Sequence, residues 1–276
     1  SDNGDSKQAA RLRSIIHPFI LRRTKIEVAK DLPPKIEVDK IIDMAPDQKA
    51  IYTQVLREVR ATVMGEVERV GVAKSQLHIL AGLTKLRQAA CDPRLLGLPR
   101  DFSHDDSGKL SALRELVDEV ESGGHKVLIF SQFVSMLKLV REALDEDKIR
   151  YEYLDGSTMD RQERVDRFQE DPTVPAFLIS LKAGGSGLNL TSADTVIHFD
   201  PWWNPAVEDQ ASDRAHRIGQ KKVVTVYRLV AAGTIEEKIL QLKAKKKDLV
   251  ASVLSEDAGG AKTLTKDDLS DLFAID

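Results

Sequence analysis

The spacing of apolar residues changes repeatedly between residues 107 and 232. Short continuous apolar runs are typical of buried strands, whereas apolar positions three or four residues apart are typical of amphipathic helices. The pattern predicts strands at residues 127–130, 151–154, 176–180, 195–199 and 223–230. It predicts helices at residues 110–120, 133–144, 161–168 and 204–215. Strands that alternate with helices through short connections predict an α/β fold, in which a parallel sheet is covered by helices on both faces.

The two ends of the chain have a more helical pattern. The elements expected there are a strand at residues 35–44 and helices at residues 51–59, 75–90, 235–249 and 265–273. Residues 97–108 are rich in proline, glycine and charge, which indicates a boundary. We therefore expect three parts: residues 1–106 with one strand and several helices, residues 107–232 with the sheet, and residues 233–276 with a long helix and an acidic tail.

The composition excludes several classes of protein. Hydrophobic residues make up 42% of the chain and charged residues 31%, which is typical of a globular protein rather than a disordered one. Lysine and arginine number 41 and aspartate and glutamate 44, a net charge of −3, so any contact with DNA must come from a local basic patch. No apolar run approaches the roughly 18 residues of a transmembrane helix, and no membrane partner is expected. The chain begins at Ser1 within polar sequence that does not suggest a signal peptide, and we interpret it as a fragment of a longer protein.

Two residue types bear on redox chemistry and metals. Cys91 is the single cysteine, which excludes an intrachain disulfide and fits a reducing interior. The 6 histidines have no spacing that suggests a metal site, and none is predicted.

Three loops that follow predicted strands carry residues suited to binding phosphate. In an open parallel sheet, ligands bind at the carboxyl ends of the strands. The residues of interest there are Ser131 and Gln132 after the first strand, Ser157 after the second, and Lys182, Gly184, Gly185, Gly187 and Asn189 after the third. Hydroxyl groups and backbone N–H groups at helix starts bind anions, and glycine lets a backbone approach another molecule closely. Taken one at a time, the first two loops are explained better as a helix cap and as a turn, and the third is explained equally well as a tight structural loop.

A fourth segment carries two arginines on the predicted helix 204–215. Gln210, Arg214 and Arg217 are spaced i, i+4 and i+7 beside an apolar stripe, so the arginines are predicted to emerge together at the edge of the buried face. The planar fork of arginine matches phosphate oxygens. Asp213 stands four residues before Arg217, so an ion pair on the helix is an alternative explanation.

Two further features are ambiguous on their own. Trp202 and Trp203 stand side by side after strand 195–199, where they could stack on bases or pack against the fold. Residues 243–247 contain four lysines, which suit either DNA phosphates or a solvated helix face.

Taken in order, these segments closely resemble the second RecA-like lobe of Swi/Snf-type ATPases, the double-stranded-DNA translocases of chromatin remodellers and their bacterial relatives. The resemblance covers nearly the whole chain. Residues 19–25 and 31–35 resemble the start of this lobe, residues 86–96 resemble its helical protrusion, and residues 234–247 resemble its brace helix. Between them, residues 127–133 are similar to motif IV, residues 154–158 to the adjoining DNA-contacting motif, and residues 180–190 to motif V. Residues 209–220 match motif VI almost letter for letter. The implied fold is a RecA-like parallel sheet between helices, with an N-terminal helical protrusion and a C-terminal helical brace.

The resemblance also implies roles for single residues. Arg214 and Arg217 are similar to arginine fingers, which reach the γ-phosphate of ATP bound with Mg²⁺ mainly by the other lobe. The nucleotide-facing residues implied are Gly187, Asn189, Gln210, Arg214 and Arg217. The DNA-facing residues implied are Ser131, Gln132, Ser157, Lys182, Gly184, Gly185 and Trp203. Leu181 stands where many members have threonine, so one DNA contact is either missing or made by Ser180.

Two motifs of a complete enzyme are absent from the chain. It has no Gly-x-x-x-x-Gly-Lys-Ser/Thr loop for phosphates and no Asp-Glu-x-His sequence for magnesium. We therefore expect the chain to be half of a DNA-dependent ATPase and not to hydrolyse ATP alone. Its expected partners are double-stranded DNA and the N-terminal RecA-like lobe of the same protein. The expected location is the cytoplasm with the bacterial nucleoid, or the nucleus.

Two alternatives remain open. The lobe could belong to a strand-separating helicase that acts on single strands or RNA. It could also be a non-catalytic module that binds nucleic acid or protein, in which case the motif VI arginines are structural. A dinucleotide-binding site is disfavoured, because the third glycine of that fingerprint, counted from Gly185 and Gly187, falls on Leu190.

Overall fold

A parallel sheet forms the centre of the structure, a computed structural model that describes residues 31–183, 187–202, 204–245 and 265–274. Within these residues the sheet has six strands in the order β1-β6-β5-β2-β4-β3. The strands are β1 (Lys35–Ile42), β2 (Val127–Ser131), β3 (Tyr151–Leu154), β4 (Ala176–Ser180), β5 (Thr195–His198) and β6 (Val224–Ala231). Each pairing between neighbours is parallel. Strand β1 comes from the first hundred residues and pairs with β6 over its whole length.

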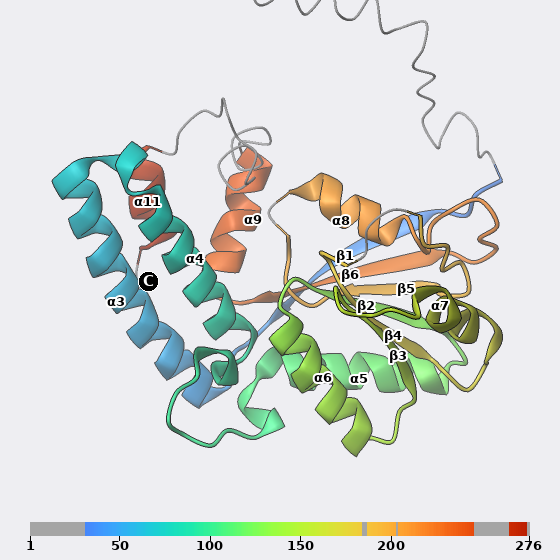
Figure 1. Cartoon of the computed structure of the whole chain (residues 1–276). Coiled ribbons are helices and arrows are strands. Elements are labelled where there is room, and N and C mark those ends of the chain that lie inside the picture. The colour runs from blue at the N-terminus through green and yellow to red at the C-terminus, as the bar shows by residue number, and fades with distance from the viewer. Residues whose placement is uncertain (1–30, 184–186, 203, 246–264, 275–276) are drawn as a thin grey trace, which may run out of the picture. The chain divides into compact units, whose positions relative to one another are not determined.

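Helices cover both faces of the sheet, which confirms the predicted α/β fold (Figure 1). On one face lie α5 (Gly108–Ser122) and α6 (Val134–Glu146), and on the other lie α7 (Arg161–Glu170) and α8 (Pro205–Ser212). Every residue of β2 is buried, with Val127 and Ile129 in the cluster under α5 and α6 and Leu128 and Phe130 in the opposite cluster. A strand buried on both faces needs apolar side chains at every position, which is why β2 reads as a continuous apolar run.

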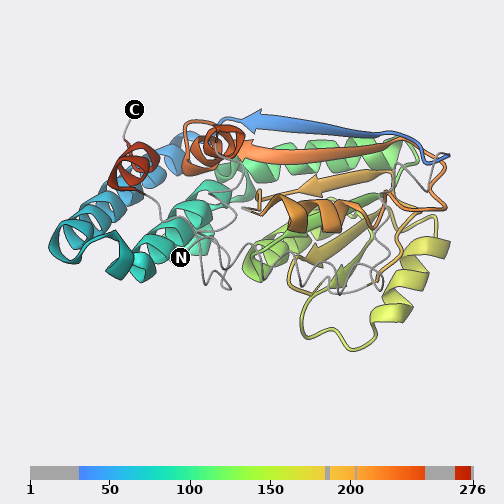
Figure 2. The ribbon, with the colours of Figure 1, turned by 90° about the horizontal axis from the view of Figure 1, so that it is seen from above.

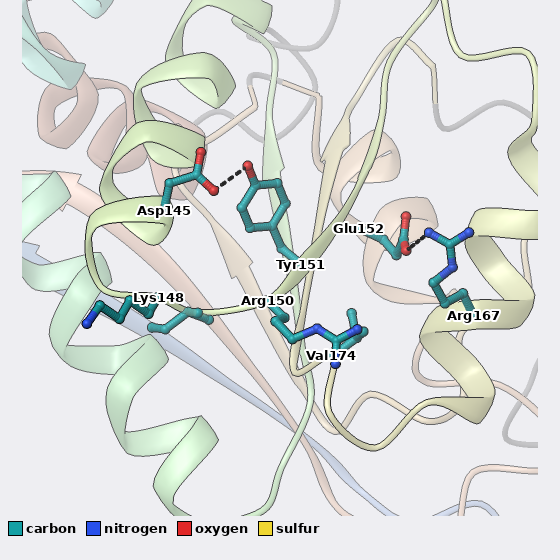
Figure 3. A pocket seen from close by; sticks show the side chains of 8 residues that line it. Asp145, Lys148, Arg150, Tyr151, Glu152, Arg167 and Val174 are labelled. Carbon is teal, nitrogen blue, oxygen red and sulfur yellow. Dashed lines mark hydrogen bonds and ion pairs between the residues drawn. The ribbon is translucent and has the colours of Figure 1, made fainter.

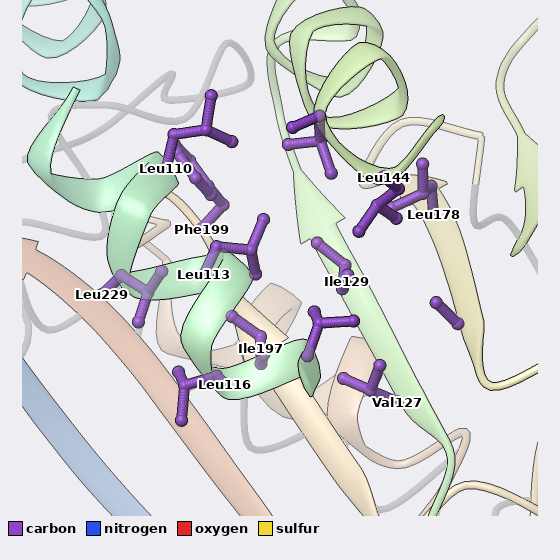
Figure 4. Packing of buried hydrophobic residues seen from close by; sticks show 14 of the residues in the cluster. Leu110, Leu113, Leu116, Val127, Ile129, Leu144, Leu178, Ile197, Phe199 and Leu229 are labelled. Carbon is purple, nitrogen blue, oxygen red and sulfur yellow. The ribbon is translucent and has the colours of Figure 1, made fainter. Parts of the chain in front are cut away.

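The cluster under α5 shows how the helix is fixed to the sheet. Leu110, Leu113 and Leu116 project from α5 toward Ile129 of β2 and Ile197 of β5 (Figure 4). Their spacing of three residues places them on one side of the helix, and each is at most 4% exposed. This packing sets the positions of the strands whose carboxyl ends carry the site.

A second layer of helices gathers at one end of the sheet (Figure 2). It contains α3 (Pro46–Val70), α4 (Gln76–Cys91), α9 (Ile235–Lys245) and α11 (Lys266–Leu272), which share a single apolar cluster. Helix α3 begins with a proline, whose missing N–H is not needed there, and α4 ends just before Asp92 and Pro93. Gly82 permits the close approach of α4 to α3, since a Cβ atom there would lie 2.6 Å from Cγ1 of Val59.

The junction between this layer and α5 is held by polar groups. The side-chain amide of Gln48 donates to the carbonyl oxygens of Ala89 and Ala90 at 3.1 Å, and it accepts from the Gly108 N–H at 3.1 Å. Gly108 itself leaves no space for a side chain, because a Cβ atom would lie 2.1 Å from the Asp43 carbonyl oxygen. The junction therefore depends on a glycine at the first position of α5.

The chain divides into two compact units, Ser1–Leu32 and Pro33–Asp276, and the elements above all belong to the second. The boundaries expected near residues 106 and 232 stay predictions. The resemblance at residues 19–25 and the part of the brace beyond Lys245 lie outside the described residues. Within the described chain, no helix has both the length and the apolar composition that crossing a membrane requires.

Candidate functional site

The carboxyl ends of four neighbouring strands bring the predicted loops to one edge of the sheet. Ser131 and Ser180 are partners in the register of β2 and β4, and Leu154 of β3 pairs with Ile179 of β4. The loops that follow are tied together by their backbones, since the Leu181 N–H donates to the Ser131 carbonyl at 3.0 Å. The topology thus brings together Ser131, Ser157 and Lys182, as expected from the sequence.

The loop after β2 is bonded to an aspartate that follows β5. The buried Ser131 hydroxyl donates to the Asp200 carboxylate, and the Gln132 N–H donates to the same group at 3.2 Å. Ser131 also accepts from the Phe133 N–H at 3.1 Å, and Phe133 rather than Ser131 is the N-cap of α6. The expectation that Ser131 caps the helix is therefore wrong, and the Gln132 N–H is bonded to Asp200.

Burial changes the acidity of Asp200. The carboxylate is fully buried, and this desolvation raises its pKa to about 6, although Arg87 and the Ser131 hydroxyl favour the charged form. Near neutral pH the group is therefore an anion that holds both the Ser131–Gln132 backbone and Arg87. Sequence reasoning missed Asp200 and Arg87. The position of Asp200 directly after a strand was the available signal for the first of them.

The loop after β3 is organised by Asp155 in a similar way. The Ser157 hydroxyl and N–H donate to the Asp155 carboxylate at 2.6 and 2.8 Å, and the Tyr153 hydroxyl donates to it at 2.8 Å. These hydrogen bonds, that of Ser157 first, lower the pKa of Asp155 to about 2. Ser157 is exposed at the tip of the turn.

Arg161 connects this turn with the loop after β4. Its guanidinium donates to the carbonyl oxygens of Thr158 at 3.1 Å and of Ala183 at 3.4 Å. Lys182, beside Ala183, is exposed. Two cations therefore stand at this edge. Sequence reasoning missed Arg161, which stands at the start of the helix after the predicted turn. Gly184, Gly185 and Trp203 lie outside the described residues.

The neighbouring tryptophan takes part in packing. Trp202 is half-buried, its backbone N–H donates to the Glu208 carboxylate at 2.6 Å, and its ring lies 5.9 Å from the guanidinium of Arg87. This contact agrees with the packing interpretation of Trp202.

The segment after α8 differs from the sequence prediction. The helix ends at Ser212 rather than Ala215, because the chain tightens into turns there. The Arg214 N–H donates to the Ala211 carbonyl at 3.3 Å, and the Ala215 N–H donates to the Ser212 carbonyl at 3.1 Å. Arg214 is buried at 7% exposure whereas Arg217 is exposed, so the two do not emerge together from a helix face. The helical spacing required for an Asp213–Arg217 pair is absent for the same reason. Burial lowers the pKa of Arg214 from its ordinary value.

The turn and the loop of Gly187 form one surface. The Leu190 N–H donates to the Arg214 carbonyl at 3.0 Å, and the buried Gln220 amide donates to the carbonyls of Ala193 at 2.8 Å and of Thr191 and Ala215 at 3.1 Å. Gly187 has φ of 93°, a conformation that favours glycine, while Asn189 and Gln210 are exposed. The predicted nucleotide-facing residues thus lie on joined segments. Sequence reasoning did not single out the role of Gln220.

A separate hollow of about 440 Å³ lies at the amino end of β3 (Figure 3). Its polar side chains pair with one another: the Tyr151 hydroxyl donates to Asp145 at 3.0 Å, and Arg167 donates to Glu152 at 3.0 Å. None of the residues predicted to bind nucleotide or DNA lines it. Among the described residues, no group of three or more histidine, cysteine or acidic side chains is arranged to hold a metal ion.

A RecA-like sheet with this loop edge defines the chain as a lobe of the helicase class. The family model of the helicase conserved C-terminal domain matches residues 108–219, and that of the SNF2-related domain matches residues 1–95. A solved SWI2/SNF2 ATPase C-terminal domain from Sulfolobus solfataricus is 33% identical, with a TM-score of 0.68 over 86% of this chain and 97% of that one. The chain therefore belongs to the SWI2/SNF2 family of ATP-dependent helicases. It corresponds to the C-terminal, RecA-like lobe of the members of this family.

Two longer proteins are also similar. The Sulfolobus solfataricus SWI2/SNF2 ATPase core in complex with double-stranded DNA is 37% identical, with a TM-score of 0.73 over 95% of this chain and 55% of that one. An uncharacterized ATP-dependent helicase of Mycoplasma pneumoniae is 40% identical over 93% of this chain and 24% of that protein. The chain spans about a quarter of the length of this relative.

Proposed function

We propose that this chain is the second motor lobe of an ATP-dependent enzyme that moves along double-stranded DNA. The observation that carries the proposal is the bond between Leu190 and Arg214, which joins the Gly187–Asn189 loop and the Arg217 turn into one surface. Arg217 is exposed there and has no ion pair within the described part of the chain. An exposed arginine with no ion pair among the described residues is suited to a phosphate brought by another lobe.

The side chains of this surface are better suited to bind the phosphates of ATP than the Mg²⁺ ion that accompanies ATP. The side chains proposed to face the nucleotide are those of Arg217, Gln210 and Asn189. None of them is a carboxylate, the group through which proteins usually hold Mg²⁺. We propose that the first lobe holds ATP with Mg²⁺, and that Arg217, with Arg214 behind it, stabilises the charge that develops on the γ-phosphate. Such an arginine is worth roughly 10³–10⁵ in rate in related phosphoryl-transfer enzymes. Without the other lobe, this chain should not hydrolyse ATP.

DNA is proposed to bind at the neighbouring loops. Lys182 and Arg161 supply cations and Ser157 supplies a hydroxyl. Ser131 and Gln132 supply loop backbone that is held in place by their hydrogen bonds to Asp200. Gly184, Gly185 and Trp203 are proposed to complete the DNA-facing loops. The relative whose structure contains double-stranded DNA supports duplex as the substrate. Such an enzyme would work where DNA is, in a bacterial cytoplasm or a nucleus.

The test is the ATPase rate of the full-length parent with linear duplex, with single-stranded DNA and without DNA. We expect strong stimulation by duplex, and loss of about 10³ or more of that rate in Arg217→Ala with the fold intact. Arg57→Ala, at an exposed arginine on α3, is the matched control and should keep the full rate.

Other outcomes favour the alternatives. Equal stimulation by single strands would indicate a strand-separating helicase. Normal hydrolysis by Arg217→Ala would mean that the arginine is structural, and the catalytic assignment would be withdrawn. DNA-stimulated turnover by the isolated chain would contradict the proposal that the other lobe is required.

A further inference from the structure

Four charged side chains are buried together behind the DNA-facing loops. Arg87 of α4, Lys109 of α5, Asp200 after β5 and Glu236 of α9 are each at most 4% exposed. They come from the helical layer and from the sheet, so the cluster lies where the two are joined. None of them is among the residues proposed to touch nucleotide or DNA.

The two cations hold the same short segment. Arg87 donates to the Asp200 carboxylate at 3.3 Å and to the Pro201 carbonyl at 3.0 Å. Lys109 donates to the Phe199 carbonyl at 3.1 Å and lies 2.5 Å from the Glu236 carboxylate. Three consecutive residues after β5 are therefore anchored to helices of both layers.

Asp200 in turn holds the loop after β2 through hydrogen bonds. Its carboxylate accepts from the Ser131 hydroxyl and from the Gln132 N–H, as described above. The guanidinium of Arg87 also lies 5.6 Å from the ring of Phe133 and 5.9 Å from the ring of Trp202. Arg87 thus contacts both the loop after β2 and the loop after β5, and through it α4 reaches them.

Stability alone is a poor explanation for this cluster. Buried ion pairs contribute little compared with apolar residues of the same volume, because both charges lose their hydration. Their best-supported use is to fix one geometry among several. A planar guanidinium with two acceptors and two aromatic neighbours is well suited to that task, and a flexible ammonium is not.

We propose that Arg87 is a positioning residue, which acts through Asp200 to hold the loops at residues 131–133 and 199–202 in their DNA-binding arrangement. The inference rests on the proposed function of those loops. It makes the helical layer part of the DNA-binding apparatus although α4 itself need not touch DNA. A displacement of α4 would then change the affinity for duplex.

The experiment measures ATPase activity of the full-length parent against duplex concentration, for Arg87→Met, Asp200→Asn, the double variant, and Arg57→Met as the matched control. We expect Arg87→Met to keep the DNA-free rate and the KM for ATP but to need about tenfold more duplex for half-maximal stimulation, within the range that coupling residues produce. Asp200→Asn should have a similar effect. The double variant should be no worse than either single one, because both changes break the same link.

Arg87→Lys keeps the buried charge but lacks the planar fork, and it should lie between wild type and Arg87→Met. It also serves as the informative variant if Arg87→Met does not fold. An unchanged half-maximal duplex concentration in Arg87→Lys and Arg87→Met, or strictly additive effects in the double variant, would overturn the inference. Absence of duplex stimulation in the wild type would instead overturn the proposed function, so the two failures are distinguishable.

Discussion

The backbone N–H of Leu190 donates a hydrogen bond of 3.0 Å to the carbonyl oxygen of Arg214. The bond joins two segments that follow different strands, and it uses main-chain atoms of both. The Arg214 side chain takes no part in this bond. This separation makes it possible to change the arginine side chains without dismantling the surface that carries them.

The two arginines should differ in their effect on folding. Arg214→Ala removes a buried side chain and should lower the free energy of unfolding by about 1–3 kcal/mol, whereas Arg217→Ala changes an exposed one and should stay within about 0.5 kcal/mol. Urea unfolding of this chain measures both values. An equal loss in both variants would mean that Arg217 is also buried in solution.

Gln220 should contribute strongly to the stability of the same surface. The two hydrogens of its amide NH2 are shared among three carbonyl oxygens within 3.1 Å, those of Thr191, Ala193 and Ala215, so Gln220→Ala leaves buried acceptors unpaired. We expect a loss of about 2–3 kcal/mol in the free energy of unfolding. The matched control is the exposed Gln210→Ala, which should change it by less than about 0.5 kcal/mol. Similar unfolding curves for the two variants would contradict the role assigned to Gln220.

Much of the fold could be predicted from spacing alone, because strands such as 127–131 and 176–180 consist of four apolar residues in a row followed by a serine. The prediction was wrong at the end of α8, where Ala215 continues the apolar stripe although the helix has ended at Ser212. There the Arg214 carbonyl bonds to Leu190, a partner distant in sequence, and hydrophobic spacing contains no information about such a bond. The Asp200 cluster was missed for the same reason, since Arg87 and Asp200 are 113 residues apart.

Two glycines should respond in opposite directions to alanine. Gly65 lies within α3 with open space around the position of a Cβ atom, so Gly65→Ala should raise the free energy of unfolding by about 0.5–1 kcal/mol. Gly108→Ala would place its methyl group 2.1 Å from the Asp43 carbonyl oxygen and should destabilise the chain by more than about 1 kcal/mol. Thermal unfolding of the pair is the measurement. A stable Gly108→Ala variant would show that α5 can shift away from residue 43.

Arg161 should contribute one phosphate contact to duplex binding. Arg161→Ala should reduce the slope of log K against log salt concentration by about 0.9, because one fewer counterion is released. The measurement is the affinity of the full-length parent for a duplex at several salt concentrations. Arg150→Ala is the control, since Arg150 is exposed at the opposite end of β3 and should leave the slope unchanged. An unchanged slope in Arg161→Ala would mean that the guanidinium only braces the two loops.

Asp200 should make the stability of this chain depend on pH. Its pKa is about 6 in the folded state, against about 3.9 in an unfolded chain, because burial outweighs the attraction of Arg87 and Lys109. Between these values the folded state holds a proton that the unfolded state has lost. The stabilising contribution is therefore complete below about pH 4 and is lost as the pH rises through about 6.

The comparison that isolates this group is wild type against Asp200→Asn, since the asparagine does not titrate and the other groups are common to both. The free energy of unfolding of wild type, minus that of the variant, should fall by about 1–3 kcal/mol between pH 4 and pH 7 and be level above that. Chemical denaturation across this range provides the values. A difference that does not fall between pH 4 and pH 7 would mean that the pKa of Asp200 is not raised in the folded state.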